Sequence, residues 1–203
     1  SDGGEGFLDT LLKWNKNLKE YYQMTCDAFR RVNSSRYLFD PSSKTLYFEL
    51  AECVGIKDLS KEELNPYRAS TYGLGIAIKN AIIKHKPLKV IVGIGGSASN
   101  DGGSGMLEAM GVMFIDKKGN VIHDMANDKL NDIYGVTTDS FNKFIKGIEF
   151  EVLTDVSNPL LGETGATYVF SPQKGASDTD LPILESNMTK FSEVCKKHFE
   201  NDF

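Results

Sequence analysis

The chain has 203 residues, 40% of them hydrophobic, which is enough to bury a sizeable core as one large domain or a split one. Its formal net charge of −5 gives no electrostatic reason to expect binding to nucleic acid or to an anionic membrane, and no apolar run approaches the roughly 20 residues of a membrane span. The three cysteines are unclustered, which indicates reduced thiols and a cytoplasmic protein, and the three histidines lack zinc-ligand spacing. Because the chain begins at Ser1 without an initiating Met or a signal peptide, we expect it to be part of a longer polypeptide.

An amphipathic helix is predicted from Phe7 to Tyr21. Its apolar face is formed by Leu8, Leu11, Leu12, Leu18 and Tyr22. The glycine-rich segment from Asp2 to Gly6 precedes it, and Asp2 has two interpretations. It is either the N-cap of the helix, which the spacing favours, or part of a nest that holds an anion, a metal or a substrate hydroxyl.

The next part of the chain is predicted to be extended. Met24 to Val32 and Arg36 to Phe39 are candidate strands, a turn follows at Asp40-Pro41-Ser42-Ser43, and Leu46 to Leu50 is another strand. The segment from Arg36 to Leu50 therefore predicts a β-hairpin.

A cluster of glycines and hydroxyls at Arg68 to Gly75 opens a second helix, which ends near His85. Ser70 and Thr71 either cap this helix or, with Gly73, bind an anion at its N-terminus; both interpretations stay open. The predicted buried face consists of Ile76, Ala77, Asn80, Ala81 and Ile83. His85 is predicted to be a solvated residue at the helix C-terminus.

The most informative stretch runs from Gly93 to Gly105, after an apolar strand from Leu88 to Val92 and before a helical segment from Met106 to Met110. Six of its thirteen residues are glycines, and Asp101 is its one carboxylate. Glycines at this density are expected where the main chain approaches a ligand closely or adopts positive φ. Its other polar residues are Ser97, Ser99, Asn100 and Ser104.

Three interpretations of this stretch compete. It is a plain strand-to-helix turn, a dinucleotide-binding fingerprint, or an anion site made of backbone amides, hydroxyls and one carboxylate. Gly93, Gly95 and Ala98 fit the fingerprint, with Asp116 as its ribose-binding acid. We reject it because the pyrophosphate-binding helix would then contain three glycines, each costing about 0.8–1.0 kcal/mol relative to alanine. No Walker A lysine follows the glycines, so the anion site is preferred.

The rest of the chain adds further strands and one long helix. Strands are predicted at Gly111 to Asp116, Val121-Ile122 and Ile148 to Leu153, with a surface excursion from Ala126 to Phe144. A final helix is predicted from Asp180 to Phe199, with one apolar stripe. The stripe consists of Leu184, Met188, Phe191, Val194, Cys195 and His198.

Two more polar positions follow the strand that ends at Leu153. Asp155 and Asn158 stand at its carboxyl end, where α/β sheets bind ligands, although an Asx-turn explains them equally. Lys174 lies between Gln173 and Gly175, and it either contacts phosphate or carboxylate or is simply solvated.

Five motifs in this order resemble the bacterial type I glycerate kinases. They are Asp2-Gly3-Gly4-Glu5-Gly6, Asn65-Pro66 with Ala69 to Gly75, Gly93 to Gly103, Thr154 to Leu160, and Phe170 to Ala176. The resemblance spans nearly the whole chain but only the middle of such an enzyme. Ser99 replaces the usual threonine of the family, and Gly73-Leu74-Gly75 replaces Gly-Thr-Gly.

The resemblance implies an α/β (α+β) fold, with a mixed β-sheet and flanking helices. Residues 1–203 would form one domain, the inserted second domain of a glycerate kinase, with short borders of a flavodoxin-like domain that is otherwise missing. It also implies a transferase that moves the γ-phosphoryl group of ATP, with Mg²⁺, to a hydroxyl of D-glycerate to give phosphoglycerate. This fragment is expected to be inactive alone.

The resemblance leads to a hypothesis for the site. Gly95, Gly96, Ser97 and Ser99 would hold the glycerate carboxylate or a phosphate, assisted by Ser70 and Thr71, with Gly73, Asn158 and Lys174 as further binding residues. Asp101 or Asp155 would orient the attacking hydroxyl, accept its proton or bind Mg²⁺, with Asp155 the candidate metal ligand and Asp2 a third candidate acid. The alternatives are a non-catalytic substrate-binding module and, less favoured, a fragment of a dinucleotide-binding oxidoreductase.

Overall fold

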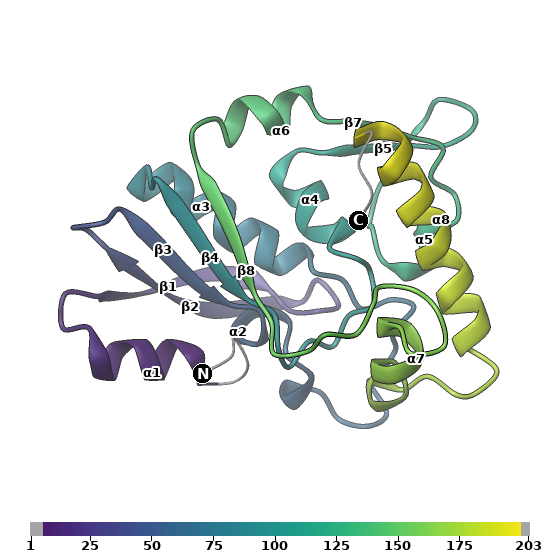
Figure 1. Cartoon of the computed structure of the whole chain (residues 1–203), viewed down its shortest axis with the longest axis horizontal. Helices are drawn as coiled ribbons and strands as arrows, with labels where there is room; N and C mark the ends of the chain where they lie inside the picture. The colour runs from purple at the N-terminus through teal and green to yellow at the C-terminus, as the bar shows by residue number, and fades with distance from the viewer. Residues whose placement is uncertain (1–5, 200–203) are drawn as a thin grey trace.

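The computed structural model describes residues 6–199. A five-stranded mixed sheet with strand order β1-β2-β3-β4-β8 forms its larger half (Figure 1). β1, β2 and β3 pair antiparallel, whereas β3, β4 and β8 pair parallel, so the carboxyl ends of the last three lie at one edge of the sheet. The strands are β1 Lys19–Cys26, β2 Val32–Asp40, β3 Thr45–Glu49, β4 Lys89–Gly93 and β8 Glu149–Leu153.

A smaller antiparallel sheet, of order β6-β5-β7, lies beside the long helix α8 (Figure 1). Its strands are β5 Met113–Ile115, β6 Val121–Ile122 and β7 Gly135–Thr137, and α8 spans Leu181–Phe199. The other helices are α1 Phe7–Trp14, α2 Ala51–Val54, η1 Ile56–Asp58, α3 Tyr72–His85, α4 Ser104–Met110, α5 Asn127–Leu130, α6 Asp139–Phe144, α7 Ala166–Phe170 and η2 Pro172–Lys174. The predicted mixed α/β fold with flanking helices is confirmed.

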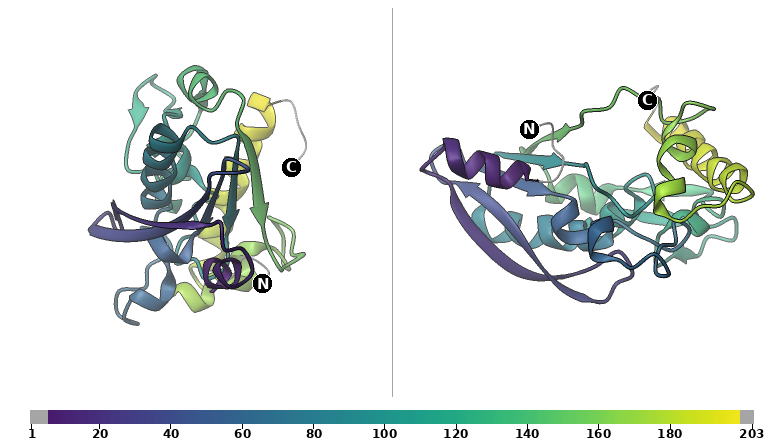
Figure 2. Two further views of the ribbon diagram at one scale, coloured as in Figure 1. Left: turned by 90° about the vertical axis from the view of Figure 1, so that its left-hand side faces the viewer. Right: turned by 90° about the horizontal axis from the view of Figure 1, so that it is seen from below.

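The alternation of side chains along the strands divides the core between the two faces of the large sheet. Leu46 and Phe48 of β3 face α3, where the largest apolar cluster forms, whereas Tyr47 faces α1. The β1–β2 hairpin curves around α3 (Figure 2), and the hydroxyl of Thr25 donates to the carbonyl of Gly73. This bond ties the first turn of α3 to β1.

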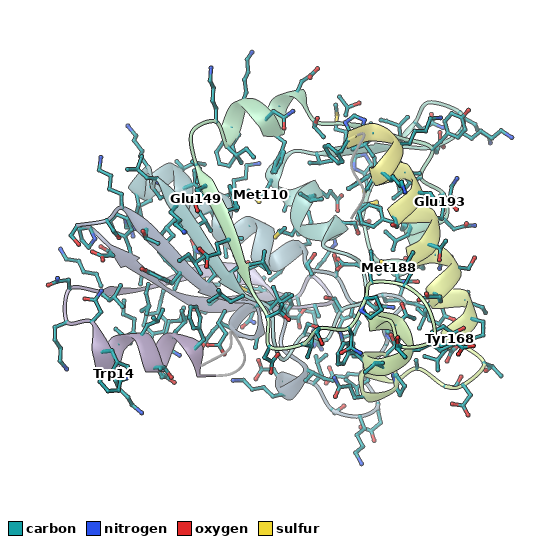
Figure 3. The ribbon with its side chains drawn as sticks, in the orientation of Figure 1. Trp14, Met110, Glu149, Tyr168, Met188 and Glu193 are labelled. Atoms are coloured by element: carbon teal, nitrogen blue, oxygen red, sulfur yellow. The ribbon has the colours of Figure 1, made fainter. Side chains whose placement is uncertain are left out.

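The predicted apolar stripe of the last helix is confirmed at four positions: Leu184, Met188, Phe191 and Val194 are buried. Phe191 meets Phe114 of β5 edge-on, with ring centroids 6.0 Å apart. Met188 points inward from α8 toward a second apolar core, which it forms with Phe191 and Phe114 (Figure 3). Among residues 6–199, no helix has both the length and the apolar character that crossing a membrane requires.

The first helix is shorter than predicted. α1 ends at Trp14, and the side chain of Asn15 accepts a hydrogen bond from the amide of Asn17 in the turn that follows. Trp14 is 85% exposed and projects into solvent (Figure 3). Tyr21 and Tyr22, which the prediction assigns to the helix, belong to β1 instead. Aromatic residues favour a pleated, half-buried strand once a turn interrupts the helix.

The two extended segments of the hairpin region also have different limits. The predicted strand from Met24 to Val32 is interrupted by a turn in which the Asp27 carboxylate accepts from the amides of Phe29 and Arg31. The predicted hairpin from Arg36 to Leu50 is confirmed as the β2–β3 pair.

The buried face of α3 agrees with the prediction at Ala77 and Ala81 but is rotated from it at the larger residues. Leu74, Ile78 and Ile82 are buried, whereas Ile83 is 60% exposed. His85 was predicted to be solvated, but it stacks on Phe39 and bonds to the hydroxyl of Tyr37. Burial and the charge of Lys84 lower the pKa of His85.

The segment from Ala126 to Phe144 is not only a surface excursion. It forms α5, β7 and α6, and Leu130 and Ile133 are fully buried against α8 and the small sheet. The prediction failed here because short elements carry too few residues to show a period.

Candidate functional site

Asp101 lies at the point where the two predicted hydroxyl-and-glycine turns meet. One carboxylate oxygen accepts from the amide and the hydroxyl of Thr71, both at 2.8 Å, and from the amide of Gly105 at 3.2 Å. The other accepts from the amide of Gly103 at 3.1 Å. Asp101 is 2% exposed, and it therefore joins the N-termini of α3 and α4 as an internal acceptor. Burial raises the pKa of Asp101, and the donated hydrogen bonds oppose this.

The hydroxyls of Ser70 and Thr71 are both used inside the protein. Ser70 Oγ donates to the carbonyl of Met125 at 2.5 Å, and Thr71 Oγ1 also accepts from the amide of Met106 at 2.9 Å. Both residues are buried, so contact with a ligand would require these bonds to be exchanged. Gly73 lies against the backbone of Cys26, where a Cβ atom would meet the carbonyl oxygen.

The loop between β4 and α4 presents free backbone donors. Within residues 6–199, the amides of Gly95, Gly96 and Ser97 donate to no protein acceptor, although their neighbours Ile94 and Ala98 do. Gly96 has a φ of 70°, which a residue with a side chain rarely adopts. Such a run of unpaired amides at a partly exposed loop suits an anion.

Lys174 lies beneath this loop. Its ammonium donates to Ser97 Oγ at 2.7 Å and to the carbonyl of Ser99 at 2.6 Å, and the residue is 8% exposed. Burial lowers the pKa of Lys174 to about 8, with the Asp101 carboxylate acting in the opposite direction. The structure therefore brings Lys174 into contact with two of the predicted loop residues, and it does not leave this lysine solvated. The residues of this loop, together with Asp101 and Lys174, are called the loop site below.

The remaining predicted residues lie at the carboxyl end of β8 or outside the described residues. Asp155 and Asn158 are exposed, and Asn158 donates to the carbonyl of Thr164 at 2.9 Å. β8 pairs with β4 and the amide of Ile94 bonds to Leu153, so this loop starts beside the one that carries the amides. Asp2 lies outside residues 6–199.

The dinucleotide interpretation does not fit this geometry. α4 begins only at Ser104, so no helix starts directly after the first glycines. Asp116 lies in the surface turn after β5, where it accepts from the amides of Lys118 and Asn120.

Sequence reasoning missed Glu49, which is 1% exposed at the carboxyl end of β3, beside Gly93. Its carboxylate accepts from the amides of Gly6 at 3.0 Å and Leu8 at 3.3 Å, and thus holds the start of α1 against the sheet. Burial raises the pKa of Glu49, and these two amides oppose the shift. The available signal was a carboxylate in the otherwise apolar run from Leu46 to Leu50.

Lys174 predicts a pH dependence of stability. Its pKa is about 8 when folded, against 10.5 for an unperturbed lysine, so between these values the unfolded chain binds more protons than the folded chain. The contribution of Lys174 is therefore complete above the unfolded pKa and is lost as the pH falls through the folded pKa. A shift of this size corresponds to about 3 kcal/mol, so we expect the free energy of unfolding to rise by that order toward pH 10.5.

Urea unfolding of the wild type and of Lys174→Met between these pH values measures the effect, because the other titrating groups cancel in the difference. Lys79→Met is the matched control, since Lys79 also donates to a backbone carbonyl, that of Ala109, at 3.1 Å. Parallel stability curves for the wild type and Lys174→Met would contradict the prediction.

Comparison with known proteins agrees with the resemblance. The chain is 34% identical over 197 residues to a glycerate kinase of Bacillus cereus, covering 97% of this chain and 51% of that protein. It is 32% identical over 202 residues to the glycerate 2-kinase of Escherichia coli K12, covering 100% of this chain and 52% of that protein. The chain thus spans about half the length of the curated relatives it matches.

The fold has a close counterpart among solved structures. A crystal structure from Salmonella typhimurium LT2, whose protein is assigned as a glycerate kinase 2, superposes with a TM-score of 0.91 at 27% identity, covering 99% of this chain and 53% of that one. The family model described as the glycerate kinase family matches residues 1–203. The chain belongs to the glycerate kinase family.

Proposed function

We propose that this chain is the substrate-holding part of an ATP-dependent glycerate kinase, which transfers the γ-phosphoryl group of ATP to a hydroxyl of D-glycerate and yields phosphoglycerate. The observation that carries the proposal is the run of unpaired amides at Gly95, Gly96 and Ser97 above the buried ammonium of Lys174. Amide dipoles and a desolvated cation both stabilise a carboxylate or a phosphate. Family membership supports the kinase reaction that we assign to this anion site.

We assign the residues as follows. The loop amides, with the hydroxyls of Ser97 and Ser99, bind the glycerate carboxylate or a phosphate. Asp101 positions this loop through Thr71 and the start of α4, because its oxygens already accept four protein hydrogen bonds. Asp155 is then the better candidate to orient the attacking hydroxyl and accept its proton, since its carboxylate is exposed at the carboxyl edge of the sheet.

The donor set is also compatible with Mg²⁺ and ATP. No group of three or more His, Cys, Asp or Glu side chains that could enclose a metal gathers within residues 6–199. Mg²⁺ at kinase sites is commonly held by one or two carboxylates together with substrate phosphates, and the exposed Asp155 fits that pattern. When bound, Mg²⁺ would neutralise charge on the phosphates.

The other half of the enzyme is expected to complete the nucleotide site. We propose that residues 1–203 are the inserted α/β domain with short borders, that a flavodoxin-like domain of the same polypeptide supplies the rest, and that the enzyme works in the cytoplasm. Relatives about twice as long as this chain support that division.

Asp155→Asn in the full-length enzyme tests the assignment. We expect kcat for glycerate-dependent ADP release to fall about 100-fold or more, the usual range for loss of a general base, with an unchanged Tm because the side chain is exposed. Asp178→Asn, at another exposed aspartate, is the matched control and should keep normal kcat.

Near-normal kcat in Asp155→Asn would remove this residue from the chemistry. Calorimetric titration of glycerate into the same variant separates the roles, since glycerate binding should persist when only proton transfer is lost. The substrate-binding alternative is tested on residues 1–203 alone, where glycerate binding without ADP release would favour a module without turnover.

A further inference from the structure

Ser97 and Lys174 form a pair that anion binding alone does not require. Ser97 is half-buried, and its Oγ atom lies 2.7 Å from the Nζ atom of Lys174. We propose that Ser97 is a nucleophile activated by Lys174, and that it accepts a phosphoryl group from a phosphoester or phosphoanhydride electrophile held in the loop. This proposal does not depend on glycerate turnover.

Lys174 donates to Ser97 Oγ in the protonated state, and loss of one proton from Nζ would let the same contact reverse. The carbonyl of Ser99, 2.6 Å away, can only accept a hydrogen bond, so it fixes one N–H of the amine. In the neutral state, the lone pair is then free to accept the hydroxyl proton of Ser97. Burial favours the neutral form and gives Lys174 a pKa of about 8; Asp101 is the charged group that opposes it.

The surroundings of Ser97 favour a phosphoryl electrophile. Within residues 6–199, the amides of Gly95, Gly96 and Ser97 itself, in the same loop as the reacting oxygen, donate to no protein acceptor. Donors of this kind stabilise the negative charge that develops on phosphoryl oxygens during attack.

The step balances without any further reactant. Ser97 Oγ forms a bond to phosphorus, the bond from phosphorus to the leaving group breaks, and the leaving group departs with that electron pair. The hydroxyl proton moves to Lys174 Nζ, which becomes an ammonium ion. Serine nucleophiles elsewhere are activated by an adjacent base in the same way.

Lys79 is an example of a lysine in this chain whose hydrogen bond has only a structural role. Lys79 donates to the carbonyl of Ala109 at 3.1 Å and, among residues 6–199, to no serine hydroxyl. Lys79 therefore supplies a control for every substitution at Lys174.

The test is covalent labelling of the full-length protein with a fluorophosphonate, read by peptide mass spectrometry. Attack by Ser97 on this probe would release fluoride and leave a phosphonyl adduct on Ser97. We expect one adduct, on Ser97, with a labelling rate that rises with pH through a midpoint near 8. Ser97→Ala should abolish the adduct, and Ser34→Ala, at an exposed serine of β2, should not change it.

Lys174→Arg separates a base from a positioning cation, because arginine keeps a charge and donors but cannot be deprotonated. We expect Lys174→Arg to lower the labelling rate at least 100-fold, and Lys79→Arg to leave it unchanged. No adduct on wild-type Ser97, or labelling of a folded Lys174→Arg within threefold of wild type, overturns the proposal. If Lys174→Arg does not fold, by circular dichroism, a pH-independent rate in the wild type overturns it instead.

Discussion

Replacing Asp101 by alanine should abolish cooperative folding, or lower the free energy of unfolding by about 4 kcal/mol or more. The substitution leaves the amides of Thr71, Gly103 and Gly105 and the hydroxyl of Thr71 without their acceptor. A buried donor that loses its partner costs roughly 1–3 kcal/mol, and a typical domain has only about 5–15 kcal/mol to lose. Asp101 also supplies negative charge near the N-terminus of α3, which its loss would remove.

Asp116→Ala is the matched control. Asp116 accepts from the amides of Lys118 and Asn120 in a similar way, but in a surface turn where water can replace the carboxylate. We expect a loss of about 1 kcal/mol or less there, measured by urea unfolding under the same conditions. Equal losses for the two variants would show that burial does not set the effect.

Asp101→Asn distinguishes the contributions of the two carboxylate oxygens to stability. An asparagine can place its oxygen toward Thr71 and Gly105, but its amide nitrogen then faces the amide of Gly103. We expect Asp101→Asn to fold, with a free energy of unfolding between those of the wild type and Asp101→Ala. If Asp101→Asn were as unstable as Asp101→Ala, the negative charge of Asp101 would contribute more to the free energy of unfolding than its hydrogen bonds do.

The parts of the fold that the sequence predicted well are those with strong local patterns. The apolar stripe of α8 recurs at helical spacing from Leu184 to Val194, so Leu184, Met188 and Phe191 could be placed on one face without any tertiary information. The β2–β3 hairpin was likewise predictable, because turn residues separate two short runs rich in aromatic and apolar residues.

The errors come from tertiary contacts that override local preference. Tyr21 continues a helical pattern in the sequence, but its place in β1 is determined by pairing with Tyr37 and stacking on that ring. His85 has the position of a solvated helix end, and only the packing of α3 against the large sheet puts Tyr37 and Phe39 around it. The residues that Tyr21 and His85 contact are too distant in sequence to be inferred from a short window of neighbouring residues.

The candidate site was predictable in its composition but not in its bonding. Glycine density and hydroxyls pointed to each segment, and the family resemblance predicted that the segments around Thr71 and Asp101 share a site; the hydrogen bonds between Thr71 and Asp101 show that they meet. The burial of Lys174 could not be predicted, because it depends on η2 packing under a loop 75 residues earlier in the chain. The catalytic and binding roles of the individual residues stay predictions.

Gly105→Ala should lower the free energy of unfolding by about 3 kcal/mol, although alanine is the better helix former by about 1 kcal/mol. A Cβ atom at this position would lie 2.1 Å from Ser70 Oγ, 2.8 Å from the amide nitrogen of Tyr72 and 3.0 Å from a carboxylate oxygen of Asp101. Two of these neighbours cannot move easily, since one is backbone and Ser70 is bonded to the carbonyl of Met125. The clash therefore outweighs the gain in helix propensity.

The same clash can be relieved in part, which makes the prediction specific. Ser70→Ala removes the nearest atom, so Gly105→Ala should cost less in that background than in the wild type, while the contact with the Tyr72 amide keeps the cost above zero. Gly135→Ala is the control, because a Cβ there meets no atom of the described residues within 4 Å, and it should change stability by less than about 0.5 kcal/mol. Urea unfolding of Gly105→Ala, Ser70→Ala, the double variant and Gly135→Ala measures these effects. If the losses of unfolding free energy at positions 70 and 105 are additive, the close approach of α3 and α4 does not limit residue 105 to glycine.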